Sequence, residues 1–381
     1  MKMKLFQLFI TASIPVLKTL LITALGSYLA TERVNILGED SRKHLNSVVF
    51  FVFNPALVGS SLAQTITYHS MIKLWFMPVN ILMTFIVGSI FGWVLILLTR
   101  TPPRLRGLTV GCCAAGNLGN MLLIIIPAVC EEKGSPFGAP DVCYAYGLAY
   151  ASLSMAISAV YFWSYVYSIV RISSKRDTLG QDTIQSLERS SIPNQIMTPP
   201  GKIMNRIMKV VKKLNLETIL SPSIVAAIVG FVIGVIPPVR KVFIEDGAPL
   251  RVINDTASLL GGGAIPAVTL IIGGNLLKGL RGSGIQTSLV IGIIIVRYVA
   301  LPLAGILIVK GAMKFGLVHS DPLYLFVLFL QFALPPAVSI ATVTQLFGAG
   351  EKECSVIMLW TYVLASVALT FWSAFFMWLV A

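Results

Sequence analysis

Charged residues are scarce in this sequence. Asp, Glu, Lys and Arg make up only 12% of the 381 residues, whereas a soluble domain carries about 25%. Hydrophobic residues make up 56%, and the mean hydropathy is +0.84. A water-soluble chain of this length could not bury so much apolar surface. The composition therefore excludes a soluble globular protein and predicts one that crosses a membrane several times.

Groups that carry enzyme chemistry are also missing. The apolar segments contain no paired acids, no Ser/His/Asp set and no cluster of metal ligands. The five cysteines lie in or beside these segments and show no disulfide or metal spacing. They are Cys112, Cys113, Cys130, Cys143 and Cys354. We therefore expect a protein that is not an enzyme and that binds neither a metal nor a cofactor.

Ten apolar runs are each long enough to cross a bilayer as a helix of about 20 residues. None alternates polar and apolar residues with the period of two that a membrane barrel requires. The runs are Leu5–Ala30, His44–Gln64, Ile72–Leu98, Leu108–Val129, Val142–Val170, Ile219–Val239, Val252–Leu277, Gln286–Val309, Pro322–Phe347 and Cys354–Ala381. They predict an all-α polytopic membrane protein with ten transmembrane helices.

A polar segment, residues 171–217, divides the runs into five and five. We expect three parts: a first five-helix repeat over residues 1–170, the loop, and a second five-helix repeat over residues 218–381. Within the loop, Lys202–Leu216 places apolar residues on one helical face and Lys and Arg opposite. Two interpretations stay open for this stretch: an amphipathic helix on an anionic membrane surface, or a solvated linker helix.

The net charge of +13 follows membrane topology and does not indicate nucleic acid. With the N-terminus outside the cytoplasm, the cytoplasmic loops carry 18 Lys and Arg residues and the opposite side carries eight. Nine of the 18 lie in the 171–217 loop. Because basic loops stay in the cytoplasm, we expect both termini outside it and the long loop inside it.

The two halves of the sequence match weakly but in the same order. Asn-Pro-Ala-Leu at 54–57 corresponds to Ile-Pro-Ala-Val at 265–268, and Phe-Trp-Ser occurs in both the fifth and the tenth run. Lys73 and Arg297 each precede a proline by five positions. Five spans is an odd number, so the second copy must enter the membrane from the opposite side. The pattern predicts inverted repeats, as in many secondary transporters, which bind substrate between broken helices near the midplane.

Two runs contain segments that are unfavourable for a helix. The fourth run contains Gly-Asn-Leu-Gly-Asn at 116–120, and the ninth contains Pro335 and Pro336. Glycine weakens a helix, and the paired prolines remove two amide donors. We predict that helices 4 and 9 break and cross, so that two helix N-termini form an anion site that does not need a buried cation. The alternative is that these residues only kink the helices.

The candidate residues follow from this prediction. For substrate binding they are Asn54, Val58, Asn117, Asn120, Pro335, Pro336, Ala337, Val338 and Ser339. Ionisable residues near the span interiors are rare, and His44 and Asp255 are the candidates to carry a coupling proton. Both lie close to span ends, so a solvated interfacial role is the alternative for them.

These segments resemble the plant PIN-LIKES family, relatives of the PIN-FORMED auxin efflux carriers, over nearly the whole chain. The matching regions are 54–57, 116–127 and 333–336 within a ten-span layout, and the short central loop is similar to that of PIN-LIKES proteins. The resemblance implies a scaffold domain (spans 1, 2, 6 and 7) and an elevator-type transport domain (spans 3–5 and 8–10). It also implies auxin, chiefly indole-3-acetate, as substrate and the endoplasmic reticulum as location.

At the site, the resemblance implies particular roles. Asn120 aligns with the amide that contacts the carboxylate, and Pro335 matches the first proline of the span-nine pattern. Gly119 stands where the PIN-FORMED pattern has its crossover proline, and Pro336 and Val58 stand where it has Gln and Ser. The resemblance therefore implies an anion site whose contacts differ in detail from those of the PIN-FORMED carriers.

We therefore expect a secondary carrier of auxin across the endoplasmic reticulum membrane that controls intracellular auxin accumulation. Both termini would be lumenal and the central loop cytoplasmic. Because the spans offer no clear coupling carboxylate, we expect the membrane potential to drive transport. The alternatives are a sodium- or proton-coupled transporter of other organic anions and, from another class, a receptor or scaffold acting through its loop. Expected partners are the anion and membrane lipids, with a homodimer as an option and no nucleic acid.

Overall fold

The computed structural model describes residues 17–18, 20–67, 74–132, 135–174, 222–245, 247–279, 284–347 and 350–380. Each of the ten apolar runs contains helix within these residues. The described residues form no β-strand and contain one isolated β-bridge. The prediction of an all-α polytopic membrane protein is therefore confirmed.

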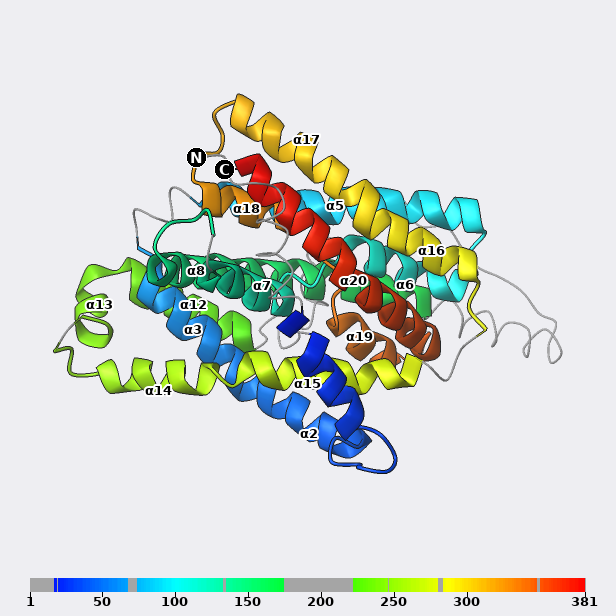
Figure 1. The fold of residues 1–381 in the computed structure, drawn as a ribbon, viewed down its shortest axis with the longest axis horizontal. Helices are drawn as coiled ribbons and strands as arrows, with labels where there is room; N and C mark the ends of the chain where they lie inside the picture. The colour runs from blue at the N-terminus through cyan, green and yellow to red at the C-terminus, as the bar shows by residue number, and fades with distance from the viewer. Residues whose placement is uncertain are drawn as a thin grey trace, which may run out of the picture.

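The helices follow the order of the apolar runs (Figure 1). The first half contains a helix over Leu20–Leu29, then α2 (Glu39–Val48), the π-helical turn η1 (Val49–Phe53), α3 (Asn54–Thr65), α5 (Phe76–Thr99), α6 (Pro103–Ala114), α7 (Asn120–Glu131), α8 (Pro140–Tyr161) and the π-helical turn η2 (Phe162–Val166). The second half contains α12 (Pro222–Val235), α13 (Pro237–Phe243), α14 (Arg251–Gly261), α15 (Ala264–Gly279), α16 (Thr287–Ile295), the π-helical turn η3 (Val296–Ala300), α17 (Leu301–Lys314), α18 (Pro322–Leu330), α19 (Ser339–Phe347) and α20 (Glu351–Val380).

Six helices in the described part of the chain are long and apolar enough to cross a membrane. They are Glu39–Gln64, Phe76–Thr99, Pro140–Ser174, Arg251–Asn275, Thr287–Lys314 and Lys352–Val380. A seventh results if α12 and α13, which are bent by 105°, form one span. The fourth and ninth runs are each broken into two helices, and the first run is described only in part. The count of ten spans in two inverted repeats therefore stays a prediction.

Proline accounts for two of the π-helical turns. Its ring collides with the carbonyl four residues earlier and it has no N–H to donate. Pro55 follows Phe51 of η1 by four positions, and Pro302 follows Tyr298 of η3 by four. The Tyr298 carbonyl accepts a hydrogen bond from the indole N–H of Trp372 at 2.9 Å. The Tyr298 carbonyl therefore keeps a hydrogen-bond partner at the point where Pro302 widens the helix.

Glycines allow some helices to pack backbone against backbone. A Cβ atom on Gly230 of α12 would collide with the carbonyl oxygen of Gly59 in α3, and one on Gly261 of α14 would lie 2.7 Å from the Leu57 Cα. Figure 1 shows α2, α3, α14 and α15 along one side of the molecule and α5, α16 and α17 along the other. Helix α20 packs against both α15 and α16.

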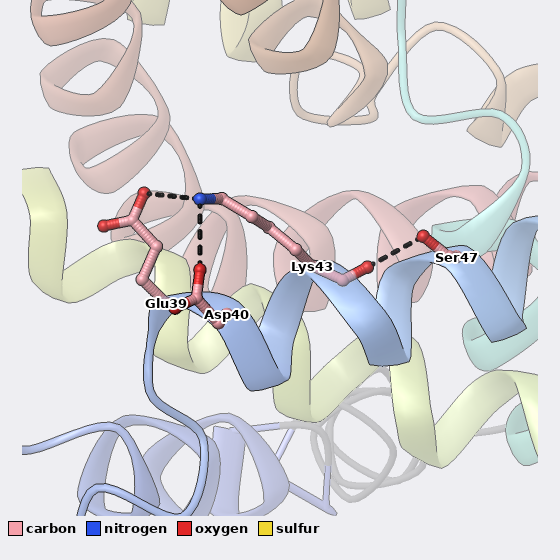
Figure 2. A network of polar contacts seen from close by, with 4 residues as sticks. All are labelled: Glu39, Asp40, Lys43 and Ser47. Atoms are coloured by element: carbon pink, nitrogen blue, oxygen red, sulfur yellow. Dashed lines mark hydrogen bonds and ion pairs between the residues drawn. The ribbon is translucent and has the colours of Figure 1, made fainter.

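Charged side chains of α2 collect at its N-terminal end (Figure 2). Glu39 and Asp40 occupy the first turn, where the helix dipole favours negative charge. The Lys43 Nζ lies 3.5 Å from a Glu39 carboxylate oxygen and 3.4 Å from one of Asp40, and Ser47 Oγ donates to the Lys43 carbonyl at 2.9 Å. These side chains are exposed, so the ion pairs contribute little to stability. Their position is consistent with a helix end at a membrane surface.

Two predictions about the central loop lie beyond what the structure tests. Lys202–Leu216 lies outside the described residues. The division into residues 1–170, 171–217 and 218–381 also stays a prediction.

One prediction about cysteine is wrong. Cys130 and Cys143 form a disulfide, and their Cα atoms are 5.4 Å apart. Cys130 lies in the last turn of α7 and Cys143 in the first turns of α8, two helices that pack against each other. The spacing of 13 residues gave no signal because the pairing depends on this packing. The three cysteines outside this disulfide are buried: Cys112, Cys113 and Cys354.

The disulfide determines how many thiols the denatured protein exposes. In SDS without reductant, full-length protein from microsomes should react with a maleimide–polyethylene glycol at three of its five cysteines, and at all five after reduction. Gel mobility counts the added chains. The double variant Cys130→Ser/Cys143→Ser is the control and should show three chains under both conditions. Five chains on unreduced protein would contradict the pairing.

Candidate functional site

The fourth and ninth spans are interrupted where the glycines and prolines predict. Residues 115–119 separate α6 from α7, and residues 331–338 separate α18 from α19. The two interruptions meet in an antiparallel bridge between Gly116 and Pro336. We call these two segments together the crossover.

The bridge satisfies backbone groups of both segments. The Asn117 N–H donates to the Pro335 carbonyl at 2.8 Å, and the Ala337 N–H donates to the Ala115 carbonyl at 2.9 Å. An unsatisfied backbone group inside a membrane costs several kcal/mol. Each interruption therefore supplies partners that the other one needs.

Side chains tie the crossover to the rest of the protein. Asn117 Nδ2 donates to the Tyr362 hydroxyl at 2.8 Å, and that hydroxyl donates to the Pro336 carbonyl at 3.0 Å. Asn117 Oδ1 accepts the backbone N–H of Asn120 at 3.2 Å. Asn117 is only 5% exposed, and both ends of its amide are occupied. Its role is to hold the crossover and the first turn of α7 in place.

A cavity of about 120 Å³ lies against the crossover, with room for several water molecules. Its lining includes both polar and aromatic side chains. The polar side chains are Asn54, Asn117, Asn120, Ser158, Ser223 and Ser339, and the aromatic ones are Phe50, Phe85, Phe162 and Trp163. The cavity therefore offers amides and hydroxyls together with aromatic rings.

Two helices begin at this cavity. Helix α7 begins at Asn120 and α19 at Ser339, and both residues belong to the lining. Gly119 precedes α7 and provides no side-chain cap. The Asn120 N–H already donates to Asn117 Oδ1, so a ligand at α7 would use the two N–H groups that follow it. In α19, the Ile340 and Ala341 N–H groups donate to the Ala337 and Val338 carbonyls. Helix N-termini favour anions because their free N–H groups carry partial positive charge. The geometry is suited to binding a carboxylate.

The structure brings together some of the predicted site residues. Those in the cavity lining are Asn54, Asn117, Asn120, Ala337 and Ser339. Pro335 and Pro336 form the crossover behind it. Val58 is fully buried in α3, and Val338 is absent from the lining. The apolar lining thus includes aromatic residues, which sequence reasoning missed, together with Leu118 and Met155.

The two candidates for proton coupling lie away from the cavity. His44 is exposed on α2. Asp255 is exposed on α14, where it forms an ion pair with Arg251 at 3.4 Å. Neither belongs to the cavity lining. A coupling role for them stays a prediction that no contact supports.

A buried cation lies behind the crossover, although the predicted anion site does not need one. Arg297, in η3 of the eighth span, is 1% exposed. Its Nη1 donates to the Cys113 carbonyl at 3.1 Å and its Nη2 to the Pro335 carbonyl at 2.9 Å. The signal was an arginine inside an apolar run, since an ionisable residue within a span is by default a functional candidate. The sequence did not show which backbone it would meet.

Comparison with known proteins assigns the chain to a class. Residues 11–373 match the family described as "Membrane transport protein". The chain is 56% identical to Protein PIN-LIKES 1 of Arabidopsis thaliana, over all of this chain and 82% of the relative. It is 55% identical to Protein PIN-LIKES 3 of the same plant, over 99% of this chain and all of the relative. Its relatives are membrane transporters and not enzymes.

Within that class, the chain belongs to the PIN-LIKES family of the auxin efflux carrier superfamily. The interrupted helices and the cavity between them are therefore features of a transporter.

Tyr362→Phe tests what holds the crossover. The change removes the hydroxyl that joins Asn117 to Pro336 and keeps the ring. Because a hydrogen bond contributes about 1 kcal/mol, we expect roughly fivefold faster hydrogen exchange at the Asn117 and Ala337 amides, measured by mass spectrometry. Tyr146→Phe is the control, because no partner of the Tyr146 hydroxyl is found in the described structure. Equal exchange in both variants would contradict the assignment.

Proposed function

We propose that this protein is a secondary carrier of auxin, indole-3-acetate, across the endoplasmic reticulum membrane, and that it controls intracellular auxin accumulation. The observation that carries the proposal is the cavity, where two helix N-termini, the Asn120 amide and four aromatic side chains meet. In this proposal, two inverted five-helix repeats form a scaffold domain and an elevator-type transport domain. The crossover belongs to the transport domain.

The polar part of the cavity suits the carboxylate. Helix N-termini supply N–H donors without the cost of burying a lysine or arginine side chain in contact with the ligand. Asn120 lies at the first position of α7 and is half-buried, so its amide N–H₂ group is available as a further donor. Hydrogen bonds to an ionised acceptor are stronger than neutral ones.

The remaining lining suits the indole ring. Phe50, Phe85, Phe162 and Trp163 offer aromatic surface, and aromatic pairs contribute about 0.5–1.5 kcal/mol beyond area burial. Asn54 Oδ1 is buried and has no hydrogen-bond partner among the described residues. An indole N–H would satisfy this acceptor, which otherwise carries the full cost of desolvation.

The lining also bears on the driving force. No Asp or Glu is found among the described residues that line the cavity. This supports transport driven by membrane potential, which supplies about 2.3 kcal/mol per charge per 100 mV. Uptake that requires a sodium or proton gradient would instead support the ion-coupled organic-anion carrier.

The disulfide supports the proposed orientation. Cys130 and Cys143 flank the connection between spans four and five. The distribution of Lys and Arg assigns this connection to the side opposite the cytoplasm. Disulfides persist in the endoplasmic reticulum lumen and are rare in the cytosol. The pairing therefore agrees with lumenal termini and a cytoplasmic central loop.

Asn120→Ala tests the carboxylate site. In proteoliposomes with an imposed membrane potential, we expect the KM for radiolabelled indole-3-acetate to rise at least tenfold, because a charge-assisted hydrogen bond is worth roughly 1.5–3 kcal/mol. Asn46→Ala, on the exposed surface of α2, is the matched control and should transport as the unmodified protein does. Unchanged kinetics for Asn120→Ala would refute the assignment of this residue.

Asn54→Leu tests recognition of the indole N–H with a change of similar volume. We expect weaker binding of indole-3-acetate by about fivefold, consistent with one lost hydrogen bond of about 1 kcal/mol. Naphthalene-1-acetate has no ring N–H, so its binding should not weaken. Equal losses for both ligands, measured by competition against the radiolabelled substrate, would show that Asn54 only shapes the cavity.

A further inference from the structure

Arg297 is a buried cation that has no carboxylate partner among the residues that the structure describes. It lies in the middle of the eighth span, and charge at that depth is costly. No described Asp or Glu forms an ion pair with it. The titratable side chains around it are thiols and phenols: Cys112, Cys113, Tyr298 and Tyr362. None of these is a carboxylate.

Backbone carbonyls compensate the charge only in part. The Cys113 carbonyl belongs to the last turn of α6, where the helix dipole is negative, and the Pro335 carbonyl belongs to the crossover. Arg297 Nε is buried and has no partner among the described residues. The guanidinium thus binds the rear of the crossover and keeps a net positive charge there.

A single glycine separates this charge from the cavity. Gly116 belongs to the cavity lining, and a Cβ on it would lie 2.6 Å from Arg297 Nη2. The guanidinium therefore lies directly behind the crossover backbone, without contact to a ligand in the cavity. In a medium of low dielectric constant, a charge acts over such a distance with little screening.

We propose that Arg297 is a positioning residue that fixes the crossover and supplies the positive charge for which the bound carboxylate is the counter-ion. This inference rests on the proposed function and deepens it. The helix N-termini and Asn120 make the contacts with the carboxylate, and Arg297 makes the site selective for a monoanion over a neutral molecule of the same shape. Because no carboxylate of the described residues lies beside Arg297, the carboxylate of the substrate can serve as its counter-ion.

The test compares carboxylates with their neutral amides. Full-length protein in nanodiscs is titrated with indole-3-acetate, naphthalene-1-acetate and phenylacetate, and with the amide of each acid. We expect the unmodified protein to prefer the acids. Arg297→Gln should weaken acid binding at least tenfold and leave amide binding within about twofold, whereas Arg297→Lys, which keeps the charge, should retain the preference.

A second arginine provides the matched control. Arg240 also donates to backbone carbonyls, those of Ala63 at 3.2 Å and Gln64 at 2.8 Å, but it lies outside the cavity lining. Arg240→Gln should therefore keep the preference for acids. If Arg297→Gln does not fold, Arg297→Lys still tests the proposal. A folded lysine variant that has lost the preference for acids over amides would overturn it.

Each remaining outcome is also decisive. Equal losses of acid and amide binding in Arg297→Gln would show a purely structural role and overturn the proposal. No preference for any acid in the unmodified protein would overturn it as well. A preference for another acid without binding of indole-3-acetate would refute auxin as the substrate, and the response of the Arg297 variants to that acid would still test the role of the charge.

Discussion

A break in a membrane helix leaves backbone N–H and C=O groups without partners, and lipid cannot supply any. The rest of the site depends on how this protein meets that constraint. Two breaks meet, and each pairs with the other through the bridge of Gly116 and Pro336. Tyr362 donates to the Pro336 carbonyl, and Arg297 donates to the Cys113 carbonyl and, together with the Asn117 N–H, to the Pro335 carbonyl. Once the backbone is satisfied in this way, the N-termini of α7 and α19 can face an open cavity.

Sequence reasoning predicted the features that depend on neighbouring residues of the chain. It failed for contacts that depend on the packing of distant segments. The interruptions could be predicted, because glycine and proline act on their own helix. The disulfide and the contacts of Arg297 could not be, because they join segments that are distant in the chain. Val58 was chosen for its place after Pro55, but Phe50 is four positions before Asn54 and therefore shares its helix face. Helical spacing alone could have identified that aromatic residue.

The cavity combines two kinds of surface that are separately common in membrane proteins. Amides and helix ends would hold the charged end of a ligand, and aromatic rings would cover its apolar body. Family membership defines a transporter, and our proposal of an aromatic acid as substrate rests on this lining. The scarcity of carboxylates around the cavity restricts the mechanism, since few groups there could exchange a proton.

The charge of Arg297 also affects which step of the transport cycle the membrane potential acts on. It is anchored to the crossover, so in an elevator-type transporter it would cross the membrane field together with the site. A carrier loaded with a monoanion would then move no net charge, because the two charges cancel. The empty carrier would return with one positive charge uncompensated. The membrane potential would therefore act on the return of the empty site, and voltage would set how soon the next anion can bind.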